Sequence, residues 1–407
     1  MYGIQTSASL PLTRPQALET QAAAPQSDAP DASAGQTRAA PQGSAAPALA
    51  AARAKADELG QAAREVRASV ERQTAYETRL AAQRSAAAFS GGEPPQARRE
   101  APGAELDEAR NAQTVSARLF EGNLKGVAQS GHAMSAEQKQ ALQSGLDDVF
   151  ADAPPQARSA GAPMLYSANA AAGQGMADSD LWDMISDQIG KIKDNYLGVY
   201  ENVVGQYTDF YKAFSDILSQ MANWIKPGGD GNKVKLNVDA LKAALEKLKK
   251  DFSLGDNLDN KKAVLFPAQS KDGGIQGGSE SDARKWAKEM GLPDAPPPGF
   301  SCVQKAADGN WVVVVDMTPI DTMIRDVGAL GSGTELELDN AKFQAWQSGF
   351  KAQEENLKNT LQTLTQKYSN ANSLFDNLVK VLSSTISSCL ETAKSFLQIL
   401  EHHHHHH

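Results

Sequence analysis

The longest regular pattern of apolar and polar positions in the chain runs from Asp339 to Leu397. Its apolar residues recur at alternating steps of four and three, the heptad spacing of a coiled-coil helix. They are Leu357, Leu361, Leu364, Tyr368, Ala371, Phe375, Leu378, Leu382, Ile386, Cys389, Ala393 and Phe396. The step from Leu382 to Ile386 is four where three is due, which locally relaxes a supercoil. No proline interrupts the segment and Asp339 suits its N-cap. A helix of this size is about 85–90 Å long and needs a partner helix.

Residues 178–225 carry the same rhythm and are the predicted partner. One stripe contains Ile185, Ile189, Ile192, Tyr196, Val199, Val203 and Phe210, and a second contains Leu197, Tyr200, Val204, Tyr207, Tyr211, Phe214 and Leu218. Two stripes indicate two buried faces. We expect one face to pair with residues 339–398 in an antiparallel two-helix coiled coil, and the other to need a cover. Lys226-Pro227-Gly228-Gly229 is expected to end this helix.

Residues 226–338, between the two long helices, mix both periodicities. Residues 233–238 and 311–315 have the pattern of strands, and 263–266 is a brief apolar run. Residues 239–252, 282–290 and 318–327 have that of short helices. The segment is predicted to be a small inserted α+β subdomain.

The N-terminal third divides into three parts. Residues 1–50, rich in Ala, Pro, Gln and Ser, are predicted to be a disordered secretion-signal region. Residues 51–150 are predicted to be an N-terminal helical hairpin region, in which 51–88 is a helix with few large apolar side chains. Residues 106–128 pair there with a helix that starts at a capping box, Ser135 and Gln138. This hairpin is the expected cover for the second stripe. Residues 151–177, with much Ala, Pro and Gly, are predicted to be a linker.

The composition restricts the classes of function that the chain can have. Residues 400–407 are an expression tag that supplies six of the seven histidines, so His132, expected to be exposed in a turn, is the only other one. Cys302 and Cys389 are interpreted as packing residues, and the pair Glu354-Glu355 as part of a solvated helix face. The net charge of −9 argues against a nucleic-acid partner. These observations argue against an enzyme, a metal site or a cofactor.

Two features favour an interaction surface at the end of the 339–398 helix. Phe396 and Leu397 keep an apolar surface where a helix would otherwise fray, covered either by the inserted subdomain or by another molecule. Small uncharged residues from Ser369 to Asn377 suit close helix contact or simple exposure. The predicted partner-binding residues are Leu374, Asn377, Val381, Lys394, Phe396 and Leu397.

Three stretches of sequence resemble the type III secretion needle-tip proteins of the SipD, IpaD and BipD group, SipD most of all. They are DNYLGVYENVVGQYTDFYKAFSDIL at 194–218, VLFPAQS at 264–270 and the segment 339–398. The similarity continues weakly through SGHAMSAEQKQAL at 130–142, whereas the Ala/Arg-rich region around 51–100 is longer than in the family.

The resemblance implies a protein secreted by a type III system and located outside the bacterium at the needle tip, in about five copies. Its implied partners are the needle subunit, the translocator proteins and further copies of itself. The family also implies a self-chaperoning hairpin, control of effector and translocator secretion, sensing of host contact, and in several members binding of bile salts such as deoxycholate. Two other interpretations stay open: a pore-forming translocator, against which the absence of an 18-residue apolar run counts, and an intracellular coiled-coil secretion adaptor or chaperone.

Overall fold

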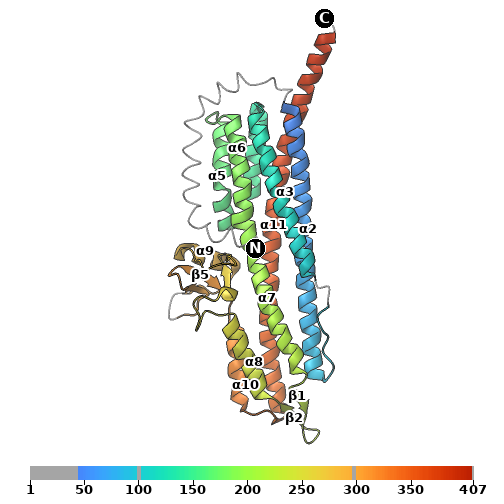
Figure 1. The fold of residues 1–407 in the computed structure, drawn as a ribbon, viewed down its shortest axis with the longest axis vertical. Helices are drawn as coiled ribbons and strands as arrows, with labels where there is room; N and C mark the ends of the chain where they lie inside the picture. Colours follow the sequence, from blue (N-terminus) through green and yellow to red (C-terminus); the bar gives the residue numbers. More distant parts are fainter. Residues whose placement is uncertain (1–44, 99–101, 296–298, 406–407) are drawn as a thin grey trace.

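The computed structural model describes residues 45–98, 102–295 and 299–405, and within them the protein is mainly helical (Figure 1). The helices are α2 (Ala46–Ser90), α3 (Gly103–Gln129), α4 (Ala136–Phe150), α5 (Pro155–Ala172), α6 (Asp178–Ile192), α7 (Gly198–Met221), α8 (Val238–Asp251), α9 (Glu280–Met290), α10 (Thr318–Leu330) and α11 (Asn340–His405). The strands are β1 (Ile225–Pro227), β2 (Lys233–Leu236), β3 (Val264–Phe266), β4 (Val303–Lys305), β5 (Trp311–Val314) and β6 (Leu336–Asp339).

The predicted coiled coil is confirmed. Every seam residue of α11 from Leu357 to Ala393 is at most 2% exposed, including Ile386 after the extra step. The α6–α7 helix runs antiparallel to α11, with the Tyr207 hydroxyl 3.3 Å from the Leu357 carbonyl oxygen. The Asp339 carboxylate accepts a hydrogen bond from the Lys342 amide (2.8 Å), as an N-cap does.

The α6–α7 helix differs from the prediction in two places. Its backbone is π-helical from Lys193 to Leu197, one of the insertions that π geometry makes in long helices. It also ends at Met221, because Ile225–Pro227 leaves the helix to pair with β2 as strand β1. The helix therefore stops before the glycine-rich turn rather than at it.

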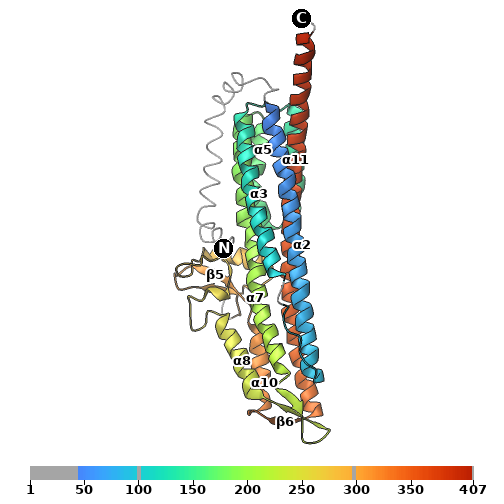
Figure 2. The same cartoon turned by 45° about the vertical axis from the view of Figure 1, so that its right-hand side comes forward.

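Helix α2 adds a third long helix that packs along α11 (Figure 2). The two run antiparallel, with Ser85 near Glu354, Thr74 near Thr365 and Ala63 near Asn372. Residues 51–88 are helical as predicted, and the helix is closely packed although it has few large apolar side chains. Alanines let the helix axes approach closely, and buried polar groups bond across the contact, as in the Thr74–Thr365 hydroxyl pair (3.0 Å).

The hairpin pairing also differs from the prediction. Helix α3 packs on α2 and α6, whereas α4, beyond the turn at Ser130, packs on α5 and α11. The capping box of Ser135 and Gln138 is present. The second stripe of the coil is thus not covered by a 106–150 hairpin: Phe214 packs on Phe350 of α11, and Tyr200 packs on Trp286 of α9.

The predicted linker at 151–177 is wrong over most of its length, because Pro155–Ala172 forms helix α5. Proline is favoured in the first helical turn, and alanine has the highest helix propensity. Gly161 is needed for packing, since a Cβ there would lie 2.4 Å from the Phe150 ring. The disordered region predicted for 1–50 is also too long. Helix α2 begins at Ala46 and Leu49 is fully buried, while residues 1–44 lie outside the described part.

The segment between α7 and α11 is the predicted α+β insertion, with two small antiparallel sheets. One sheet, ordered β1-β2-β6, lies at the start of α11, where Val234 pairs with Leu338. The other, ordered β3-β5-β4, packs beside α7 and α9. Strands β1, β4 and β6 were not predicted, because each has only three or four residues. Such short strands are stabilised by pairing with neighbouring strands.

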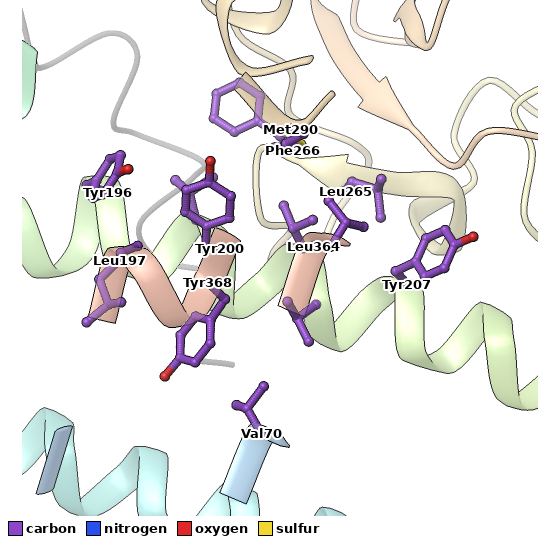
Figure 3. Packing of buried hydrophobic residues seen from close by; sticks show 14 of the residues in the cluster. Val70, Tyr196, Leu197, Tyr200, Tyr207, Leu265, Phe266, Met290, Leu364 and Tyr368 are labelled. Atoms are coloured by element: carbon purple, nitrogen blue, oxygen red, sulfur yellow. The ribbon is translucent and has the colours of Figure 1, made fainter. Parts of the chain in front are cut away.

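The core joins these layers where α7, α11 and the insertion meet. Figure 3 shows Tyr200 of α7, Leu364 and Tyr368 of α11 and Phe266 of β3 in this region, with Tyr368 pointing toward Val70 of α2. All five side chains are at most 3% exposed. Buried aromatic rings contribute large apolar areas, so this junction fixes the insertion on the coil.

Candidate partner-binding surface

A shallow groove of about 290 Å³ lies between α4 and α11. Its lining residues are small or uncharged apart from Lys380; they are Gln138, Ala141, Gly145, Lys380, Val381, Ser384, Thr385 and Ser388. Gly145 makes the close approach possible, because a Cβ at that position would lie 2.7 Å from a Val381 methyl carbon. At one end the Gln138 side-chain amide donates to the hydroxyls of Ser388 (3.2 Å) and Thr392 (3.1 Å). A groove of this kind, between two helices and lined by small side chains, suits a third helix.

The uncovered end of α11 continues the groove. Because α2 is antiparallel to α11, with Asp57 near Ser383, its first turn reaches only the neighbourhood of Ser395. Helix α4 reaches only Thr392 through Gln138. Beyond these points α11 extends past the other described helices (Figures 1 and 2). Leu397 is 39% exposed and Ile399 66% exposed there. The inserted subdomain lies beside the first half of α11 (Figure 1), so it does not cover this apolar surface.

The six predicted residues fall into two groups. In the middle of α11, Asn377 is exposed, whereas Leu374 and Val381 are half-buried against the core, Val381 in the groove. At the end of the helix, Lys394 and Leu397 are exposed and Phe396 is half-buried. Val381 is thus the one predicted residue that lines the groove itself. The sequence did not indicate Gln138 or Gly145, because nothing in it shows that α4 lies beside α11.

The Asn/Ser-rich stretch from Ser369 to Asn377 makes a close helix contact, one of the two uses expected for it. Asn372 is 1% exposed and donates from its side-chain amide to the Ala63 carbonyl oxygen (3.0 Å). Ser369 is 2% exposed and donates to Glu71 (3.2 Å). These small polar groups serve close helix packing, but the partner is α2 of the same chain.

The side chains that could carry chemistry, two cysteines and one histidine, are packed in the interior of the protein. Cys302 and Cys389 are free and fully buried, as packing residues are, and burial raises the pKa of both thiols. His132 is 2% exposed, so its predicted exposure is wrong; burial lowers its pKa against the opposing effect of Asp178. Among the described residues, no group of three or more His, Cys, Asp or Glu side chains is arranged to hold a metal ion. None of their helices is both long and apolar enough to cross a membrane.

The pair Glu354-Glu355 departs from the predicted solvated face. Glu355 is exposed, but Glu354 is covered by α2 and accepts a hydrogen bond from the Ser85 hydroxyl (2.9 Å). Burial raises the pKa of Glu354 to about 7, despite the lowering effects of Ser85 and Lys351. This carboxyl lies in a helix interface, outside the groove.

A family model for type III secretion systems tip complex components matches residues 40–397. The chain belongs to this family, and it is a component of a type III secretion tip complex. Membership favours this interpretation over a translocator or an intracellular adaptor.

Relatives and a solved structure agree with this assignment. The chain is 51% identical to the cell invasion protein SipD of Salmonella typhi over 292 residues, which cover 72% of this chain and 79% of SipD. It is 48% identical to the invasin IpaD of Shigella flexneri over 225 residues, 55% of this chain and 61% of IpaD. The crystal structure of the Pathogenicity island 1 effector protein from Chromobacterium violaceum matches with a TM-score of 0.80 at 97% identity, covering 85% of this chain and all of that one.

Proposed function

We propose that this tip-complex component docks onto the needle through the α4–α11 groove and the uncovered end of α11. The observation that carries the proposal is one continuous strip along α11, from Val381 through Ser388 to Leu397. Its first part is grooved and its last part has no covering helix among the described residues. A helix of the needle subunit lying along this strip would bury the apolar residues at the end.

In this proposal the protein caps the needle in about five copies, forms the platform for the translocator proteins, and holds back secretion until host contact. Helices α2 and α3 act as the self-chaperone. Together with α4 and α5 they cover faces of the coil that would otherwise bind apolar surfaces nonspecifically. Polar contacts between α2 and α11 give this cover a defined register.

We propose the same groove as the binding site for bile salts such as deoxycholate. Most of the surface that its small lining residues expose is apolar, and the exposed Lys380 at its edge, which also pairs with Asp376 (3.1 Å), provides a cation for the carboxylate of a flat amphipathic steroid. Because Val381 belongs to both surfaces, bound deoxycholate would compete with the needle subunit. The bile salt would in this way act on tip assembly itself.

Deleting residues 391–398 tests the docking proposal. We expect the deletion to abolish needle-tip assembly while leaving most of the helicity, because it removes only one fully buried seam residue of α11, Ala393. Tip occupancy can be counted on purified needles by immunolabelling, with circular dichroism as the check on folding. The matched control lacks only residues 400–407. Normal occupancy by the 391–398 deletion would overturn the proposal.

A further inference from the structure

Two helices on either side of α6 have apolar, solvent-exposed outer faces. Helices α3 and α5 both pack on α6 (Figure 1). On α3, Val115 is 59% exposed and Leu119 45% exposed; on α5, Tyr166 is 46% exposed. Large apolar side chains at this exposure on each of two helices are typical of protein contact surfaces.

Both outer faces carry small residues beside larger ones. The stripe on α3, at helical spacing, is Glu108, Ala112, Val115, Leu119, Gly122 and Gly126. The stripe on α5 is Arg158, Ala162, Tyr166 and Asn169, and Arg158 is the only charged residue in this helix. A Cβ added at Gly122 or Gly126 would meet no atom within 4 Å, so the space beyond both glycines is open. The α3 face therefore allows another helix to approach closely.

The two faces match in level along the molecule. The pairs Thr74–Thr365 and Arg72–Glu105 fix the level of α3 relative to α11. The approach of Gly145 to Val381 and the hydrogen bond of Gln143 to Asn169 fix that of α5. Counting along the helices places Leu119 and Tyr166 at the same level.

The same difference in residue number between α3 and α5 places other complementary residues at similar levels. Val115 lies at the level of Ala162, and Gly122 at that of Asn169. Arg158 is about one turn from the level of Glu108, within the reach of its side chain. Since α3 and α5 both run in the direction of α11, two upright copies side by side would present these faces in parallel.

We infer that the α3 face of one copy docks on the α5 face of the next copy in the assembled tip. The contact is heterologous, because the two faces differ, and such contacts close into rings when the rotation between neighbours allows it. Leu119 packs on Tyr166 at its centre and Glu108 pairs with Arg158 at its edge. The inference rests on the proposed assembly at the needle tip and specifies how neighbouring copies meet.

A cysteine pair tests the geometry. The Leu119→Cys/Tyr166→Cys variant, added to purified needles and oxidised, is expected to give a ladder of covalent dimers and higher multimers, because each copy offers one cysteine to each neighbour. Cys302 and Cys389 are buried and stay inert. Each single-cysteine variant is expected to stay monomeric. A double variant that occupies tips but remains monomeric would overturn the inference, as would dimers from a single variant.

A charge exchange tests the same contact independently. Glu108→Arg is expected to lower tip occupancy several-fold, and Glu108→Arg/Arg158→Glu to restore it. Both positions are exposed, so folding is expected to be unaffected. No loss in the single variant, or no restoration in the double variant, would contradict the pairing. If the wild-type chain itself failed to bind needles, the docking proposal would be refuted instead. Failure of the docking proposal and failure of this inference are therefore distinguishable.

Discussion

Replacing Arg110 with methionine is expected to lower the free energy of unfolding by about 3–5 kcal/mol. The Arg110 Nε lies 2.9 Å from a carboxylate oxygen of Glu201, and both side chains are only 3% exposed. Burial lowers the pKa of Arg110 to about 10, and the attraction of Glu201 partly offsets it. Removing the guanidinium leaves the Glu201 carboxylate buried without this ion pair, which costs more than the pair itself contributes.

The double variant Arg110→Met/Glu201→Leu separates the contribution of the ion pair from the cost of leaving Glu201 buried without it. It removes both charges and fills the space with apolar groups, so we expect a stability within about 1 kcal/mol of the wild type. Urea unfolding followed by circular dichroism measures all three proteins. A single variant as stable as the wild type would show that the pair does not tie α3 to α7.

Replacing Glu354 with glutamine is expected to stabilise the protein by about 2 kcal/mol above pH 7 and to change little below pH 4.5. The carboxyl has its pKa raised to about 7 in the folded protein, mainly by burial. The folded state therefore binds the proton more tightly than the unfolded state does. The stability that this group contributes is complete below its ordinary pKa and is lost as the pH rises through about 7.

The difference in the free energy of unfolding between Glu354→Gln and the wild type reports on Glu354 alone, because the other carboxyls are the same in both proteins. Unfolding at pH 5 and pH 8 gives that difference, with Glu355→Gln as the control for removing one charge from the exposed neighbouring position. Glutamine preserves the shape of the side chain and an acceptor for the Ser85 hydroxyl. A difference that does not grow with pH would contradict the burial of a titrating Glu354 under α2.

The long coil could be predicted because large apolar side chains mark a heptad clearly, as Leu357 to Leu382 do. Helix α2 was recognised as a helix, but its packing was not, since alanines and the Thr74–Thr365 contact carry no strong pattern. Helix α5 was missed because Pro155 and Gly161 look like breakers until Phe150 is placed against the glycine. The burial of Glu354 depends on the same unrecognised α2 contact.

The candidate surface was predictable only in part. Val381 and Leu397 follow from apolar positions on a helix with a polar surface. The groove also needs Gln138 and Gly145, which approach α11 from a helix more than 200 residues away in sequence. The spacing of apolar residues within one helix does not predict which other helix packs beside it.

The most direct test of the docking proposal is an NMR titration of the isotope-labelled protein with its cognate needle subunit, with and without deoxycholate. We expect the shift changes to concentrate at Val381, Ser384, Ser388 and Leu397, to leave Val313 of the insertion unchanged, and to weaken when deoxycholate is present. Changes confined to the insertion or to the outer face of α3, with none along the strip from Val381 to Leu397, would contradict needle docking at this surface.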